Sequence, residues 1–170
     1  VVWKGDDDTA PIVDNEEEVY GHRISSAGAL IGSQFRISFM GNEAETDPSM
    51  RNQIDALDPR VVINTSNNEA LVVWAADDDT GALVNNEIEI YGQRLASNGN
   101  LVGSRIRISM IGTDGVTTFG ALTFNSPPGA AFNASNDEYF VTWTADAPFD
   151  NDFEVSGQRI NANTGALIGS

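Results

Sequence analysis

The chain has no cysteine, a single histidine and few basic residues. Its 170 residues include 9 Lys+Arg against 25 Asp+Glu, which gives a formal net charge of −16. The lack of cysteine excludes disulfides, thiolate nucleophiles and cysteine-ligated zinc. The shortage of Lys and Arg argues against a nucleic-acid partner, because proteins bind phosphates with basic patches. It also disfavours an anionic membrane surface.

Long apolar runs are missing as well. No segment approaches the roughly 18 apolar residues that a membrane-spanning helix needs, so we expect no membrane insertion. The sequence starts without Met or a leader segment, so we interpret it as a processed or excised piece of an exported polypeptide. The expected location is extracellular or at the cell surface. Apolar residues make up 41% of the chain, which is typical of a folded protein.

The sequence contains few of the residues and motifs that catalysis usually needs. There is no G-x-S-x-G motif, no glycine-rich phosphate loop and no histidine pair, and His22 matches Gln93 and Gln158 in the repeat described below. A glycosidase needs one unique pair of carboxylates, whereas the acids of this chain recur at regular spacing. We therefore expect a protein that is not an enzyme.

The strongest feature that is present is a repeat of about seventy residues. Trp3, Trp74 and Trp143 correspond. Two sets of glycines also correspond between the units, and an arginine lies two residues after each glycine of the first set. These positions are Gly21, Gly92 and Gly157 with Arg23, Arg94 and Arg159, and Gly32, Gly103 and Gly169. We predict an N-terminally incomplete unit at 1–59, a complete unit at 60–127 and a C-terminally incomplete unit at 128–170.

The complete unit has the pattern of four strands. They are predicted at Arg60–Asn64, Glu69–Ala75, Glu87–Leu95 and Ser104–Ser109. The second is apolar throughout, as in a strand buried on both faces. The third alternates Ile88 and Ile90 with Glu87 and Glu89, and Asn98-Gly99 is a hairpin signal. Arg36, Arg105 and Arg107 are expected as outward charges. One short helical piece is possible at 48–57.

This pattern predicts an all-β fold of tandem four-stranded antiparallel units. A tryptophan in the second strand of each unit is typical of β-propeller blades, and β-sandwich repeats are the alternative. The chain is expected to start inside strand two of its first unit and to stop just before strand four of its third. A ring cannot close with this small number of blades. We therefore expect self-association or further repeats of the same polypeptide.

The motif resembles the tandem repeats of large bacterial surface and secreted proteins, which follow VVW…D…IYGQR…G…RIS. The match covers nearly the whole chain. The third unit departs from it at Ser156, where the pattern has Tyr, and at Pro148-Phe149 in a loop that is otherwise acidic. The resemblance implies propeller-like modules outside the cell and no single activity.

An acidic loop separates the second and third strands of each unit. Clustered carboxylates are hard oxygen ligands, and they predict calcium as a cofactor. The metal-ligand candidates are Asp6, Asp7, Asp8, Asp77, Asp78, Asp79, Asp146, Asp150 and Asp152. The alternative is a solvated loop whose carboxylates pair with Arg23, Arg94 and Arg159. No EF-hand loop is present.

Other positions indicate binding or modification. Asn64 and Asn133 begin N-x-S sequons at equivalent positions of two units, and they are candidates for glycosylation. The three repeated tryptophans are expected in the core. Tyr20 and Tyr91 are the better candidates for exposed aromatic residues that bind a ligand such as a carbohydrate.

These features favour a non-enzymatic extracellular structural or adhesive repeat protein, assembled into a surface layer or filament and stabilised by calcium. One alternative is a carbohydrate-binding, lectin-like propeller with a shallow site on each blade. Another is a non-catalytic part of a secreted hydrolase.

Overall fold

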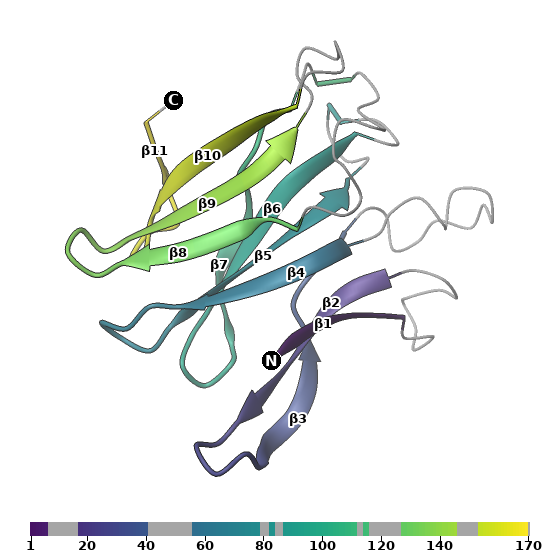
Figure 1. Ribbon diagram of the computed structural model, residues 1–170. Coiled ribbons are helices and arrows are strands. Elements are labelled where there is room, and N and C mark those ends of the chain that lie inside the picture. The colour runs from purple at the N-terminus through teal and green to yellow at the C-terminus, as the bar shows by residue number, and fades with distance from the viewer. Residues whose placement is uncertain are drawn as a thin grey trace.

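A computed structural model describes residues 1–6, 17–40, 56–78, 82–83, 87–111, 114–115, 127–145 and 153–169. This part of the chain is all-β, as predicted, and forms three antiparallel sheets (Figure 1). The N-terminal sheet contains β1 (Val2–Asp6), β2 (Glu17–Ile24) and β3 (Leu30–Arg36). The central sheet contains β4 (Ala56–Ile63), β5 (Ala70–Asp77), β6 (Ile88–Leu95) and β7 (Leu101–Arg107). The C-terminal sheet contains β8 (Gly129–Asn133), β9 (Glu138–Ala145), β10 (Glu154–Asn161) and β11 (Leu167–Ile168).

Segments that match in the sequence occupy matching places in the sheets. In every sheet the strands are neighbours in chain order. Trp3 pairs with Tyr20 across β1 and β2, Trp74 pairs with Tyr91 across β5 and β6, and Trp143 pairs with Ser156 across β9 and β10. Each of the three glycine–arginine pairs also lies in one strand, β2, β6 or β10.

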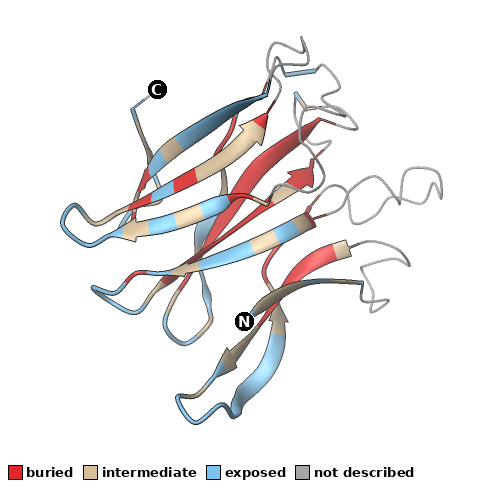
Figure 2. Cartoon of the chain, viewed as in Figure 1, coloured by how far each residue is buried: buried red, intermediate tan, exposed pale blue. Residues whose placement is uncertain are grey.

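The central sheet lies between the other two and is covered on both faces (Figures 1 and 2). Successive side chains of a strand point to opposite faces. Leu71 and Val73 therefore pack with the C-terminal sheet, while Val72 and Trp74 pack with the N-terminal sheet. The prediction that the second strand of this unit, observed as β5, is buried on both faces is confirmed. Burying residues such as Leu or Val stabilises a protein by about 1.5–3 kcal/mol each.

Glycine is required at two kinds of position. A Cβ on Gly92 would lie 2.8 Å from Ile108 Cδ1 and 3.3 Å from Leu71 Cδ1, so a larger residue collides with the core. Gly99 has a φ of 92° in the turn between β6 and β7, a conformation that other residues rarely adopt. The strand register shifts between Gly92 and Arg94, and it shifts at the equivalent place in β2.

Several boundaries differ from the predictions. The first strand of the central sheet starts at Ala56 rather than Arg60, and a register shift accommodates Pro59 within it. Proline lacks the N–H of a regular ladder, which is why it lies at such an irregularity in an edge strand. The predicted unit boundary at 59/60 thus falls inside β4, and the possible helical piece ends in that strand, while its residues 48–55 lie outside the described ranges. The strand predicted at Ser104–Ser109 is observed at Leu101–Arg107.

The third unit contains the beginning of a fourth strand. Leu167 and Ile168 form β11 and pair with Ile160 and Arg159, so the chain does not stop before that strand as expected.

Among the described residues, no helix is long and apolar enough to cross a membrane.

Candidate functional site: buried carboxylates beside the loops

Glu89 on β6 is fully buried, and its carboxylate accepts hydrogen bonds from three other residues. Arg107 Nη2 donates to Glu89 Oε1 over 2.5 Å, and the hydroxyl of Ser109 donates to Oε2. The backbone N of Ile111 lies 2.9 and 3.1 Å from the two carboxylate oxygens. The carboxylate therefore ties the segment after β7 to the neighbouring strand.

The N-terminal sheet contains the same arrangement. The buried carboxylate of Glu18 accepts from the guanidinium of Arg36, from the hydroxyl of Ser38 and, over 2.8 Å, from the backbone N of Met40. Each serine hydroxyl also accepts from a strand N–H, Val19 over 2.6 Å and Ile90 over 2.7 Å. We call the two sets, Glu18–Arg36–Ser38 and Glu89–Arg107–Ser109, the glutamate brackets.

Burial dominates the electrostatics of both glutamates. Desolvation raises the pKa of Glu18 and of Glu89, because burial disfavours the charged carboxylate. The hydrogen bonds from serine, arginine and the backbone act in the opposite direction and offset part of this effect. Asp114, in contrast, is exposed, and its hydrogen bonds with Arg107 lower the pKa of its carboxyl group.

Carboxylate oxygens of three residues gather at this end of the central sheet. One oxygen each of Glu87, Glu89 and Asp114 lies within 4.8 Å of the others. Glu87 accepts from the backbone N of Gly115 over 2.9 Å, and Arg107 donates to Asp114 over 2.7 and 3.1 Å. Such oxygen ligands suit calcium. A calcium ion here has to share the Glu89 and Asp114 oxygens with the Arg107 guanidinium.

The predicted metal ligands do not form this cluster. Asp6 is exposed at the end of β1, whereas Asp77 and Asp78 are buried at the end of β5. Asp78 forms an ion pair with Arg105. The remaining candidates lie outside the described residues, and they are Asp7, Asp8, Asp79, Asp146, Asp150 and Asp152.

The expectation that the side chains of Arg36 and Arg107 point outward is wrong. Arg36 and Arg107 turn toward buried glutamates rather than outward, and Glu87 and Glu89 are themselves fully buried. A neighbouring sheet covers the face that alternation alone would assign to solvent, and the arginines on the adjacent strand compensate the buried charge. Asp114 lies 71 residues after Glu43, the spacing that also separates Arg36 from Arg107, so the repeat offers a signal for this acid that the loop-based candidates overlook.

Arg105 joins two sheets. Its guanidinium donates to the backbone oxygen of Phe39 in the N-terminal sheet's final segment and pairs with Asp78 of its own sheet. It also lies over the ring of Tyr91, 5.1 Å from the ring centroid, at a distance suited to a cation–π contact. The expectation of an outward charge is therefore wrong here too.

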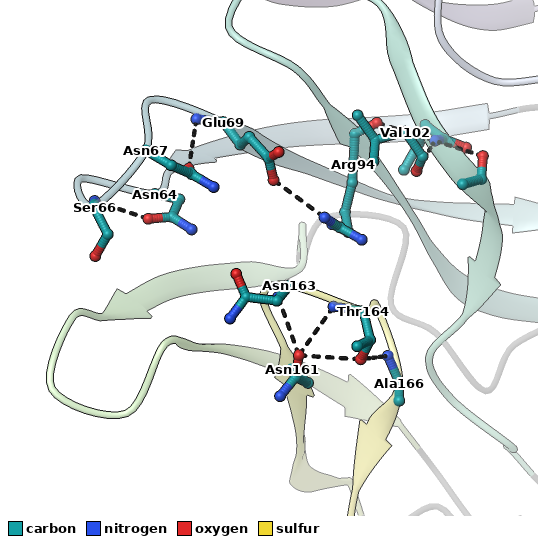
Figure 3. Close-up of polar contacts among 12 residues, drawn as sticks. Asn64, Ser66, Asn67, Glu69, Arg94, Val102, Asn161, Asn163, Thr164 and Ala166 are labelled. Atoms are coloured by element: carbon teal, nitrogen blue, oxygen red, sulfur yellow. Dashed lines mark hydrogen bonds and ion pairs between the residues drawn. The ribbon is translucent and has the colours of Figure 1, made fainter.

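Two of the three repeat arginines, Arg94 and Arg159, pair with glutamates at or next to the start of the neighbouring strand. Arg94 Nη2 lies 3.1 Å from Glu69, and Arg159 Nη1 lies 3.5 Å from Glu138 (Figure 3 for Arg94). In the described part of the chain, the alternative pairing that we considered for these two arginines is therefore not seen.

Both tyrosines proposed as exposed binding residues are buried, Tyr20 at 5% and Tyr91 at 2% exposure. That expectation is wrong, because each ring lies on a sheet face beside the paired tryptophan, and in the case of Tyr91 the neighbouring sheet covers that face. Trp74 is fully buried, as expected for a core residue, and Trp3 and Trp143 are half-buried.

The two predicted glycosylation sites differ in exposure. Asn133 is exposed, whereas Asn64 is buried, and its side-chain oxygen accepts from the backbone N of Ser66 in the turn after β4 (Figure 3). The same type of turn occurs at Asn133, whose side chain accepts from Ser135 N. Burial argues against a glycan on Asn64 in the folded chain, and modification of Asn133 stays a prediction.

His22 has a structural role that explains its match to glutamine. His22 Nε2 lies 3.0 Å from the carbonyl oxygen of Gly32 across the register shift between β2 and β3. At the equivalent places, Gln93 donates to Val102 O over 3.1 Å and Gln158 donates to Ile168 O over 3.0 Å. The side chain at this position thus contacts a backbone carbonyl of the following strand in all three sheets.

Comparison with known proteins found no matching family model, no similar curated protein and no similar solved structure.

Proposed function

We propose that the chain is part of a non-enzymatic extracellular structural or adhesive repeat protein, built from propeller-type blades and assembled into a surface layer or filament. The observation that supports this most is the central sheet, which obtains its core from a neighbour on each face. A protein in which each repeat contacts only its neighbours extends by adding units, as repeat proteins do.

The use of the buried charges supports a structural role. Both glutamate brackets fix the segment that follows the last strand of a sheet, and Arg105 connects that segment of one sheet with the next sheet. The same contacts recur in two sheets, which is typical of structure rather than of a unique catalytic centre. The carboxylates of the brackets are engaged by arginine, serine and backbone donors.

Calcium is part of the proposal. The oxygens of Glu87, Glu89 and Asp114 and the buried Asp77 and Asp78 lie at the loop end of the central sheet, where added positive charge offsets their mutual repulsion. A ligand that binds only the folded state stabilises it by about 2.7 kcal/mol at a concentration 100 times its dissociation constant.

The test compares thermal unfolding in excess CaCl₂, in MgCl₂ and in chelator. We expect calcium to raise the melting temperature by several degrees, and we expect Glu87→Gln combined with Asp114→Asn to remove most of that increase. Glu17→Gln, at an exposed ion pair with Lys4, is the matched control and should keep the response. If the melting temperature and the molecular mass in solution are the same with calcium and with chelator, calcium has no part in the fold.

A further inference from the structure

The contact between the central and C-terminal sheets shows how one sheet covers the next. Leu71, Ile88 and Ile90 lie on one face of the central sheet and are 0%, 6% and 1% exposed. They pack in one cluster with Tyr139, Val141 and other residues of the C-terminal sheet. Val141, Trp143 and Ile160 belong to the covering face and occupy the repeat positions of Val72, Trp74 and Leu95 in the central sheet.

The C-terminal sheet presents the equivalent of the covered face to solvent. Phe140, Phe153 and Val155 occupy the repeat positions of Leu71, Ile88 and Ile90, and they are 47%, 43% and 77% exposed. We call these three residues the tail face. Exposed apolar residues scattered singly are ordinary, whereas these three follow the alternation of one face of one sheet.

The N-terminal sheet presents the equivalent of the covering face. Val1, Trp3 and Ile24 occupy the positions of Val141, Trp143 and Ile160. Val1 and Ile24 are 63% and 43% exposed and Trp3 is half-buried, whereas Val141 and Ile160 are fully buried. We call these three residues the head face.

At both contacts between neighbouring sheets, a turn of one sheet packs against an arginine side chain of the other. The position of a Cβ on Gly165 lies 3.5 Å from Arg94 Cδ, and that of Gly99 lies 3.2 Å from Arg23 Cδ. The turn of each sheet therefore rests on the arginine stem of the sheet before it. Gly28, the equivalent turn glycine of the N-terminal sheet, has no atom within 4 Å of its Cβ position.

Arg159, the equivalent arginine of the C-terminal sheet, is also more exposed than its counterpart in the central sheet. The Arg94 side chain is 8% exposed beneath the Gly165 turn, whereas the Arg159 side chain is 52% exposed. The N-terminal sheet thus exposes the head face and the Gly28 turn, and the C-terminal sheet exposes the tail face and Arg159. These are the two sides of the contact that neighbouring sheets already make within the chain.

We propose that the head face of one copy of the chain docks on the tail face of a second copy, with the Gly28 turn over Arg159. The proposal rests on the self-association in the proposed function and assigns the surfaces for it. Such a contact is heterologous, so repetition gives a ring or an open filament. The net charge of −16 opposes the association, so higher salt strengthens it.

The test uses Val155→Asp on the tail face, Ile24→Asp on the head face and Met110→Asp as the control. Met110 is 74% exposed and lies in the segment after β7, so it matches Val155 in exposure without belonging to either face. We expect the wild-type chain and Met110→Asp to associate with rising concentration in sedimentation velocity. Each face variant should weaken association at least about tenfold, because docking buries an unpaired charge.

Mixing the two face variants gives the sharpest result. Each retains one intact face, so an equimolar mixture should form a dimer of one copy of each variant and nothing larger. Association of the wild type that neither face variant weakens contradicts the proposed faces but leaves self-association standing. A wild-type chain that stays monomeric at all concentrations contradicts both. Folded variants, checked by circular dichroism, whose mixture forms no dimer contradict head-to-tail docking.

Discussion

Arg107 holds its guanidinium 2.5 Å from the fully buried carboxylate of Glu89 on the neighbouring strand, 18 residues earlier in the chain. Arg36 and Glu18 form the same pair, at the same separation in sequence, in the N-terminal sheet. A charge buried with its partner is tolerated, and removing one partner leaves the other without compensation. The predictions on stability begin from this pair.

Arg107→Met should destabilise the chain by about 3 kcal/mol at neutral pH, because the Glu89 carboxylate loses its counter-charge inside the protein. Urea unfolding followed by tryptophan fluorescence measures the change. Arg60→Met is the control, since Arg60 is exposed and its side chain donates to the adjacent Pro59 carbonyl, and it should change stability by less than about 0.5 kcal/mol. Equal effects of the two substitutions contradict a structural role for the pair.

The stability of Glu89→Gln relative to the wild type should depend on pH. Burial raises the pKa of Glu89 above its ordinary value of 4.5, so the folded state holds this proton more tightly than the unfolded state. The resulting stabilisation of the wild type is complete below the unfolded pKa and is lost as pH rises through the folded pKa. The glutamine variant does not titrate, so it should gain stability relative to the wild type as pH rises through that window.

Urea midpoints measured from pH 4 to pH 7 test this trend. Glu18→Gln should follow the same direction, because burial raises the pKa of Glu18 as well. A stability difference that stays constant over this range indicates that the carboxylates titrate alike in the folded and unfolded states.

Gly92→Ala should destabilise the chain by about 1–3 kcal/mol through overpacking, since the new Cβ lies 2.8 Å from Ile108 Cδ1. Ile108→Val removes that methyl group, so the double variant should recover part of the loss in a double-mutant cycle measured by urea unfolding. Gly103→Ala is a comparison with a different cause. Nothing lies near its Cβ position, and its cost arises from a φ of 69°, so Ile108→Val should not relieve it.

His22→Gln should be nearly neutral, within about 0.5 kcal/mol, because glutamine makes the equivalent contacts at positions 93 and 158. Gln93→Ala should cost about 1–3 kcal/mol, since Gln93 is buried and its amide donates to the carbonyls of Arg94 and Val102. Thermal unfolding of the two variants distinguishes them. A large loss in His22→Gln would mean that the imidazole has a role that the amide cannot replace.

The all-β fold and most strands of the central sheet could be predicted, because each strand carries a local pattern. The continuous apolar run around Trp74 and the turn glycines such as Gly99 need no information from distant parts of the chain. The start of β4 was missed, because Pro59 disfavours a regular strand and only pairing with β5 extends the strand to Ala56.

The candidate site was predicted only in part. Arg107 was expected to point outward, yet it pairs with the buried Glu89, because the burial of that glutamate depends on the neighbouring sheet, which a local pattern does not show. Tyr91 was misplaced for the same reason. Asp114 joins the carboxylate cluster from the segment after β7, and its match to Glu43 at the repeat spacing of 71 residues was a signal outside the acidic loops that predicted the metal ligands.

The mass of the wild-type chain in solution tests the proposed assembly most directly. Sedimentation equilibrium over a wide concentration range, at low and at moderate salt, should give masses that rise above 18.2 kDa with concentration and rise further with salt. A mass that stays at 18.2 kDa under all of these conditions contradicts self-association of this chain.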